Sequence, residues 1–283
     1  HPALDIANNG LPLLAAGLMV LFLLSLALRS RMLIITTASL LAIALAVLIP
    51  NLSGDAPKAP EHAERFLRVA TFNVGVKGDL RVKEVESFFA ETDADVMVLE
   101  EVSAKHEKLL RHMRRAYPHQ VGKGGLVILS KHPVLDWGWL DRSHRRCRLS
   151  PIGKWARVDV GGRNVGIVGV HMRRPTYPSL HKSGFDKLRR FLTNTTEPVI
   201  VAGDFNAAPW TQQLHGTLAE TGLKRLNTVT PTWPAQWRDL PLLPVLPIDN
   251  ILVSNNLSKI DLWVGPRLGS DHLPVIADIA FVE

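Results

Sequence analysis

The sequence predicts a pair of membrane-spanning helices followed by a layered α+β sandwich, in which helices lie outside two β-sheets. Residues 1–50 are almost entirely apolar, whereas residues 60–283 mix charged, aromatic, Gly and Pro residues as a globular domain does. In this second part, short β-branched runs alternate with amphipathic stretches. The turn GGRN at 161–164 joins two of these runs as a hairpin would, so we do not expect purely parallel sheets.

The N-terminal part contains two uncharged apolar runs, Leu11 to Leu28 and Met32 to Ile49, each close to the roughly 20 residues that span a bilayer. Only Arg29-Ser30-Arg31 separates them, which predicts a tight transmembrane hairpin within residues 1–50. Arginines favour a cytoplasmic turn, so both ends are expected outside the cytoplasm, at the inner membrane of a bacterium. Buried core helices rarely lack a polar face over this length, and a cleaved signal peptide would have a shorter apolar stretch.

A linker is predicted between the hairpin and the globular domain. Residues 51–65, NLSGDAPKAPEHAER, are polar and include two prolines, so residues 66–283 are expected to form a domain held near the bilayer. Because the chain starts at His1 rather than Met, we also expect residues upstream, which could include another span.

The domain is predicted to contain many strands with a few helices between them. Helices are expected at 79–91 and 102–115, and strands at 68–74, 95–99, 126–130, 155–160, 165–172, 198–206, 247–254 and 273–281. The Pro-rich segment 231–247 is the least regular. Its two tryptophans, Trp233 and Trp237, could line a site, but packing of a loop is the favoured interpretation.

The amino-acid composition excludes few kinds of binding partner. The single cysteine, Cys147, excludes an intrachain disulfide, and the net charge of +7 suits a polyanionic partner as well as it suits simple solubility. Basic clusters at 105–115, 142–148 and 182–190 could bind nucleic acid or anionic head groups, although solvated helix faces are favoured for the first and third.

Polar side chains stand where several apolar strands end, and such positions gather at one edge of a sheet. Asn73 closes the first strand, Glu100 and Glu101 follow the second, and His171 ends a long apolar run. Taken alone, Asn73 could belong to a turn, the two glutamates could begin a helix, and His171 could be a core histidine.

Three later motifs are more informative. In GDFN, Asp204 and Asn206 set an acid and an amide two residues apart where a buried strand emerges. Asp249 lies inside an apolar strand, where a carboxylate is costly unless it is hydrogen-bonded. Asp271 and His272 directly precede the last strand, where an acid and an imidazole could serve a metal and a phosphate together.

Taken in order, the motifs TFNV, LEEV, VHM, GDFN, IDNIL and SDHLP resemble the endonuclease/exonuclease/phosphatase superfamily, which has the DNase I-like fold. The resemblance covers roughly residues 67–282. It implies a four-layer α/β/β/α sandwich with the catalytic groups at one edge of two packed sheets. It also implies hydrolysis of a phosphoester bond, for which a phosphodiesterase or nuclease is our main expectation.

The resemblance also implies a metal site. Glu101, with Asn73 and Asp271, would bind Mg²⁺ or Mn²⁺, and oxygen ligands of this kind suit hard cations. The sequence departs from the family pattern at Glu100, where Gln is frequent, and at Asn250, where His is frequent. The first departure leaves open which glutamate faces the metal.

The remaining site residues are assigned catalytic roles by the same resemblance. Asp204 would hold or deprotonate the attacking water, while Asn206 and His171 would donate to the phosphoryl oxygens. His272 would contact the phosphate, oriented by Asp249, because a carboxylate behind an imidazole fixes its tautomer. No covalent nucleophile is required.

The expected partner is a phosphate-containing substrate. Nucleic acid, lipid head groups and inositol phosphates all remain open, and a membrane tether modestly favours lipid. A non-catalytic anion-binding module is the alternative from another class, and the intact constellation argues against it. No protein partner can be inferred.

Overall fold

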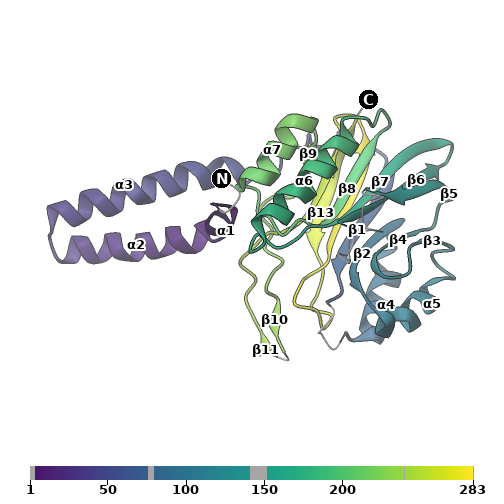
Figure 1. Cartoon of the computed structure of the whole chain (residues 1–283), viewed down its shortest axis with the longest axis horizontal. Coiled ribbons are helices and arrows are strands. Elements are labelled where there is room, and N and C mark those ends of the chain that lie inside the picture. Colours follow the sequence, from purple (N-terminus) through teal and green to yellow (C-terminus); the bar gives the residue numbers. More distant parts are fainter. Residues whose placement is uncertain (1–3, 76–79, 141–151, 239, 283) are drawn as a thin grey trace.

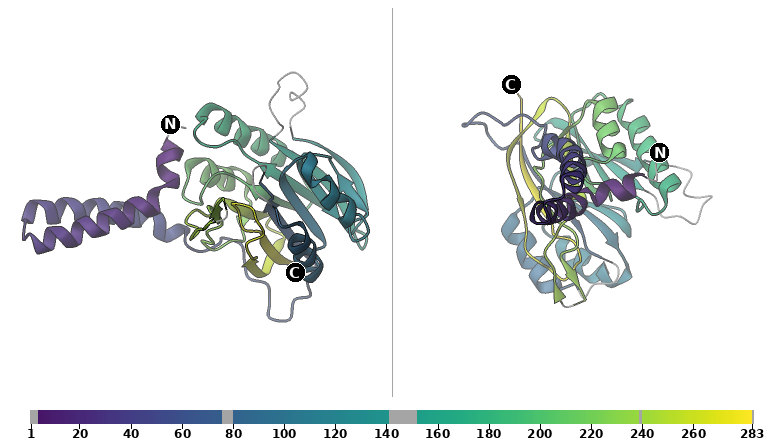
Figure 2. Two further views of the ribbon diagram at one scale, coloured as in Figure 1. Left: turned by 90° about the horizontal axis from the view of Figure 1, so that it is seen from below. Right: turned by 90° about the vertical axis from the view of Figure 1, so that its left-hand side faces the viewer.

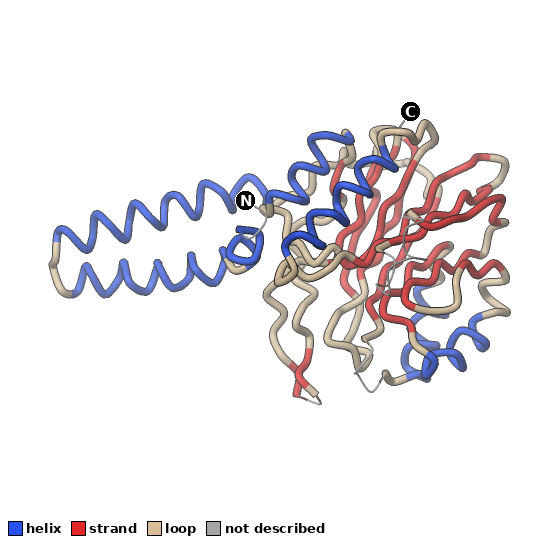
Figure 3. The backbone as a smooth tube through the Cα atoms, in the orientation of Figure 1, coloured by secondary structure: helices blue, strands red, loops and turns tan. Residues whose placement is uncertain are grey.

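A helical rod and a layered domain make up the protein (Figures 1 and 2). This computed structural model describes residues 4–75, 80–140, 152–238 and 240–282. In the domain, helices interrupt runs of several consecutive strands (Figure 3), and the last strand of the chain pairs with the first.

The first sheet has six strands in the order β13-β14-β1-β2-β4-β3. Their bounds are β1 Leu67–Asn73, β2 Val96–Val102, β3 His119–Val121, β4 Gly125–Ser130, β13 Leu257–Val264 and β14 Val275–Phe281. Only the β1 and β2 pair is parallel, and the other neighbours are antiparallel.

The second sheet also has six strands, in the order β5-β6-β7-β8-β12-β9. Their bounds are β5 Val134–Trp139, β6 Gly153–Val160, β7 Arg163–His171, β8 Val199–Asp204, β9 Lys224–Arg225 and β12 Asp249–Val253. Gly161 and Gly162, both with positive φ, turn β6 into β7, so the expected hairpin is present. A separate short ribbon pairs β10 (Gln236–Trp237) with β11 (Leu240–Pro241).

Two helices cover the outer face of each sheet. The first sheet carries α4 (Val82–Thr92) and α5 (Glu107–Met113), which the short turn η2 (Ala104–His106) precedes. The second carries α6 (Pro178–Leu192) and α7 (Gln212–Thr221).

The inner faces of the two sheets meet in a core of small and β-branched side chains. Val69, Val98, Ile167 and Ala202 are buried there, as their alternation along the strands requires. The four-layer α/β/β/α sandwich expected from the sequence is therefore confirmed.

The N-terminal helices are α1 (Leu4–Asn9), α2 (Leu11–Ala27) and α3 (Arg31–Leu48), followed by the turn η1 (Ile49–Asn51). Helices α2 and α3 run side by side, joined by a turn in which Arg29 has a φ of 53°. Ser25 and Thr37 approach to 3.4 Å between their hydroxyl oxygens across this pair. Within the described residues, the helical segment Arg31–Asn51 is long and apolar enough to cross a membrane, while α2 is apolar but shorter.

The segment after the hairpin lies against the domain. The buried guanidinium of Arg225 in β9 donates to the carbonyl of Asn51 at 2.8 Å, and the amide of Asp55 donates to the carbonyl of Arg225 at 2.9 Å. Further along, the amide of Ala59 donates to Lys259 in β13. These contacts attach the start of the linker to both sheets.

Candidate active site

Three of the expected site residues form one row across the second sheet. His171 ends β7, Asp204 ends β8 and Asp249 begins β12; the strand register pairs His171 with Asp204 and Asp204 with Asp249. The sequence permits this row because residue 203 is glycine. Gly203 has a φ of 147°, and a Cβ there would lie 2.0 Å from the carbonyl oxygen of Val170.

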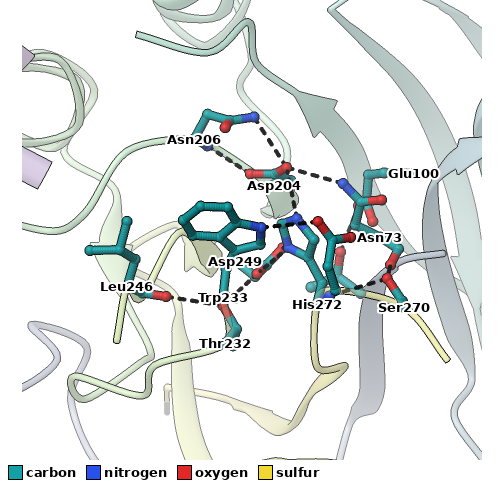
Figure 4. Close-up of polar contacts among 12 residues, drawn as sticks. Asn73, Glu100, Asp204, Asn206, Thr232, Trp233, Leu246, Asp249, Ser270 and His272 are labelled. Atoms are coloured by element: carbon teal, nitrogen blue, oxygen red, sulfur yellow. Dashed lines mark hydrogen bonds and ion pairs between the residues drawn. The ribbon is translucent and has the colours of Figure 1, made fainter. Parts of the chain in front are cut away.

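Asp204 is the centre of the site and is almost fully buried. Its Oδ2 accepts hydrogen bonds from the side-chain amides of Asn73 and Asn206, each at 3.1 Å, and its Oδ1 accepts from the main-chain amide of Asn206 at 2.8 Å (Figure 4). Burial raises the pKa of Asp204; the charge of Asp249 adds to this, while His272 and His171 act in the opposite direction. A carboxylate held in this way can accept a proton from a reacting group.

His272 lies between Asp249 and Asp204. Its Nδ1 is 2.9 Å from Asp249 Oδ2, and its Nε2 is 3.8 Å from Asp204 Oδ2. The Thr232 hydroxyl donates to the same Asp249 oxygen. Burial alone would lower the pKa of His272, but the charges of Asp249 and Asp204 and the hydrogen bond to Asp249 raise it to about 10. At neutral pH this imidazole is therefore cationic, which suits contact with a phosphate.

Glu101 reaches the site because β2 is irregular at its end. The pairing of β2 with β4 shifts between Glu100 and Val102, and Glu101 has a φ of 55°. Its carboxylate lies 3.7 Å from His171 Nε2, which is also 3.7 Å from Asp204 Oδ2. The structure thus brings Glu101, and not Glu100, to the row of His171 and Asp204.

Glu100 lies beneath the site instead. It is fully buried, faces Asn73 in the parallel β1–β2 pair, and accepts a 2.7 Å hydrogen bond from the Thr71 hydroxyl. Burial raises the pKa of Glu100 well above its usual value; Thr71 opposes this, and the charges of Asp249 and Asp204 reinforce it. A neutral Glu100 is close in shape and hydrogen bonding to the glutamine frequent at this position in the family.

Asp271 is held by the Pro-rich segment. Trp233 Nε1 donates to Asp271 Oδ2 at 3.1 Å, and the amide of Ala235 donates to the Asp271 carbonyl at 2.7 Å. The interpretation of the two tryptophans as loop packing is therefore wrong, since Trp233 contacts a site residue and Trp237 is 68% exposed. The segment has no strand or helix periodicity that could have revealed this.

Two further contacts were missed from the sequence. Ser270 Oγ donates to the carbonyl of Asn73 at 2.6 Å and accepts from the amide of His272 at 3.1 Å, so it joins the two ends of the site. Its place in the SDH motif was a signal for this role. Thr232, the partner of Asp249, gave no signal, because a lone threonine beside proline is ordinary in loops.

Among the described residues, one cluster of ligand atoms could hold a metal ion. Asp204, Asp249 and His272 have ligand atoms within 4.8 Å of one another. The Nδ1 of His272 is already engaged by Asp249, however, which favours a proton-handling or phosphate-binding role for this buried trio. The set expected from the sequence, Asn73, Glu101 and Asp271, offers the oxygen donors that Mg²⁺ and Mn²⁺ prefer.

The donor chemistry fits a divalent cation. Glu101, Asp204, Asp249 and Asp271 bring carboxylate oxygens to this edge. Hard divalent cations such as Mg²⁺ and Mn²⁺ prefer ligands of this kind.

The basic clusters are not part of this constellation in the described residues. On α5, His112 pairs with Glu86 at 2.5 Å, and on α6, Lys182 pairs with Asp186 at 2.8 Å. Such pairs are typical of solvated helix faces. The cluster at 142–148, with Cys147, lies outside the described residues.

Comparison with known proteins agrees with this geometry. Residues 70–272 match the endonuclease/exonuclease/phosphatase family. A search of curated proteins gives no match. Among solved structures, an endonuclease/exonuclease/phosphatase from Beutenbergia cavernae is similar, with 20% identity, a TM-score of 0.60, and coverage of 77% of this chain and 72% of that chain.

Two other structures have the same fold. Truncated TDP2 from Caenorhabditis elegans shares 18% identity at a TM-score of 0.60, covering 76% of this chain and 98% of that one. Sphingomyelinase C from Streptomyces griseocarneus shares 19% identity at a TM-score of 0.54, covering 75% and 98%. At these identities the structures support the fold, while the sequence match supports the family. The chain belongs to the endonuclease/exonuclease/phosphatase family of phosphoester hydrolases.

Proposed function

We propose that this protein is a divalent-metal-dependent phosphodiesterase that is tethered to a membrane by its N-terminal hairpin. The observation that carries the proposal is the row His171, Asp204 and Asp249, with His272 bridging the last two. The row places an acceptor for a proton next to two imidazoles, at the edge where β1 and β2 of the other sheet also end. Nuclease activity is the form of this reaction that we expect first.

The residues divide the reaction between them. Asp204 would orient the attacking water and take its proton, which its raised pKa favours. His272, cationic and held by Asp249, would stabilise the developing charge on the phosphoryl oxygens, with His171 as a further donor. Asn206, expected from the sequence to donate to the same oxygens, already donates both side-chain amide hydrogens to Asp204 and Met172, so it would hold Asp204 instead. Fixed donors of this kind are most effective when they need no reorganisation during the reaction.

Members of this family generally use a divalent metal, and Asn73, Glu101 and Asp271 would hold it here. A bound Mg²⁺ or Mn²⁺ would neutralise charge on the phosphoryl and leaving oxygens.

A lipid phosphoester is the second candidate, and one contact favours it. Trp210 and Ala208, which follow Asn206 in the chain, pack against Leu11, Ala15 and other apolar residues at the base of the helical hairpin. If the hairpin spans a bilayer, the active-site loop would lie close to its surface, where head groups are the most abundant phosphodiesters. Helix α1 and the domain lie at the same end of the hairpin, so both would lie on the same side of a membrane. The arginines of the turn at the other end favour the outer side of the inner membrane for them.

The test uses the full chain reconstituted in nanodiscs. With Mg²⁺ or Mn²⁺ it should hydrolyse bis(p-nitrophenyl) phosphate, and a chelator should stop the reaction until metal is restored. Asp204→Ala and His272→Ala should each lower turnover by about 10³-fold or more, because each removes a group that contacts the reacting atoms.

The matched control is Asp136→Ala, which removes an exposed carboxylate on β5 and should leave turnover unchanged. Unchanged activity in both site variants would refute the assignment of the site. Plasmid DNA, phospholipid vesicles and inositol phosphates, compared side by side, would distinguish the nuclease from the lipid candidate. A wild-type chain that is inert on all of them would contradict the proposed activity.

A further inference from the structure

Helix α1, which precedes the apolar hairpin, touches the catalytic loop that follows Asp204. The side chain of Asn9 lies between two peptide groups of this loop: its Nδ2 donates to the carbonyl of Asn206 at 3.1 Å, and its Oδ1 accepts from the amide of Ala208 at 2.8 Å. Asn9 is only 8% exposed. The donor and the acceptor of this one side chain thus bind two main-chain groups that lie 197 and 199 positions further along the chain.

Two neighbouring contacts hold α1 in place. The carboxylate of Asp5, fully buried, accepts from the amide of Gln212 at 2.8 Å, where α7 begins. The indole of Trp210 donates to the main-chain carbonyl of Asn8 at 2.6 Å. The contact surface therefore extends from Asn206 to Gln212 and is not a single accidental hydrogen bond.

Asn206 needs this support because its backbone is unusual. Its φ is 48°, in the left-handed region that non-glycine residues seldom adopt. Its amide and side chain are tied to Asp204, and its Nδ2 also donates to the carbonyl of Met172 at 3.0 Å. Asn9 binds the main-chain carbonyl of Asn206 and the main-chain amide of Ala208.

We propose that Asn9 is a positioning residue of the candidate active site, which fixes the main chain on either side of Ala207 and so holds the Asn206 amide against Asp204. The inference rests on the proposed function, in which Asp204 orients the attacking water. It makes the segment before the first apolar helix part of the catalytic apparatus, although the family match begins only at residue 70.

The experiment compares two alanine variants of the full chain in nanodiscs. Asn9→Ala should lower kcat by about 10-fold to 100-fold, the usual effect of losing a group that orients a site residue, with a much smaller change in KM. Asp5→Ala removes an equally buried contact of the same helix, but at Gln212. It should lower the melting temperature with little effect on kcat. Asn8→Ala keeps the carbonyl that Trp210 uses and should behave as wild type.

Hydrogen exchange at the Ala208 amide gives a readout that does not depend on turnover. This amide should exchange faster in Asn9→Ala, because its acceptor is gone, and at the wild-type rate in Asp5→Ala. Wild-type kcat and exchange in Asn9→Ala would overturn the proposal, as would equal losses of kcat in the two variants. If the wild-type chain is inert, the proposed function fails, and the exchange result still decides whether Asn9 holds the loop.

Discussion

The candidate active site has two halves that differ in burial. The closed half, Asp204, Asp249 and His272, is buried; His272 lies 2.9 Å from Asp249 and 3.8 Å from Asp204. The open half contains Glu101 and His171, whose side chains are 22% and 29% exposed, against 2% for Asp204. The two halves meet at His171, which lies 3.7 Å from both carboxylates.

This difference indicates a division of labour. Donors and acceptors that already hold one another need no rearrangement, so the closed half suits stabilisation of charge as it develops on a phosphoryl group. The Glu101 carboxylate is partly exposed, so an ion from solvent can reach it, which suits the binding of metal in the open half. Variants should therefore affect turnover in the closed half and metal dependence in the open half.

The largest effect in this comparison is expected from Asp249→Asn. The change keeps the shape of the side chain but removes the charge that holds His272 as a cation, so kcat should fall by at least about 10²-fold at saturating metal. Burial lowers the pKa of His272, and Asp249, together with Asp204 and Asp271, raises it to about 10, so the variant should lose the protonated imidazole at lower pH than wild type does. In a pH profile of kcat, the fall in activity on the alkaline side should therefore begin at lower pH in Asp249→Asn than in wild type.

Stability provides the control for this variant. Leaving a buried imidazolium without its partner costs about 3–5 kcal/mol, so the melting temperature should be recorded alongside kcat. Thr232→Val removes only the hydroxyl that donates to Asp249. It should lower kcat and the melting temperature, each by less than Asp249→Asn does. An alkaline limb that stays in place in Asp249→Asn would show that His272 does not titrate as the geometry requires.

The second prediction concerns the open half. Glu101→Gln should lower the apparent affinity for Mg²⁺ by about 10-fold to 100-fold, because a charged oxygen ligand is replaced by a neutral one. Much of the lost turnover should return at high metal concentration, in contrast to Asp249→Asn. Glu107→Gln, an exposed change in α5, serves as the control. If the metal dependence of Glu101→Gln equals that of wild type, the division between the halves is wrong.

The closed half was largely predictable from the sequence, and the open half less so. GDFN places Asp204 at the end of a strand, IDNIL places Asp249 at the start of one, and SDHLP directly precedes the last strand. The antiparallel pairing of β8 with β12 then aligns Asp204 with Asp249. The orientation of Glu101 depends on a β-bulge, which period-two alternation cannot show, since one inserted residue changes which glutamate faces the site.

Contacts made by irregular segments could not be predicted at all. Trp233 lies in a Pro-rich stretch without periodicity, and Asn9 stands in a short helix before an apolar run, yet both contact the catalytic apparatus. Their role depends on pairings over long sequence separations. Local patterns carry no information about such pairings. The succession of strands and helices along the chain and the hydrophobic alternation within each strand, from which the layered fold was predicted, can be read locally.

The smallest effect is expected from a change at Glu100, which lies beneath the site. Glu100→Gln should change turnover by less than about threefold, because burial raises the pKa of Glu100 and so favours its neutral form, and the amide preserves its shape and the hydrogen bond from Thr71. Glu101→Gln is the matched change one residue away. A large loss of turnover in Glu100→Gln would mean that this carboxyl group is ionised and acts in the site.

The same variant has a pH signature. The folded-state pKa of Glu100 is raised above the ordinary value of 4.5, so its protonation stabilises the fold at low pH, and that contribution is lost as pH rises toward the raised pKa. Glutamine cannot lose a proton. The melting temperature of Glu100→Gln relative to wild type should therefore increase as pH rises above about 4.5, which a series of thermal melts would measure. A difference in melting temperature that is constant with pH would show that Glu100 is not a buried neutral acid, and the closed half would then have to include a further negative charge.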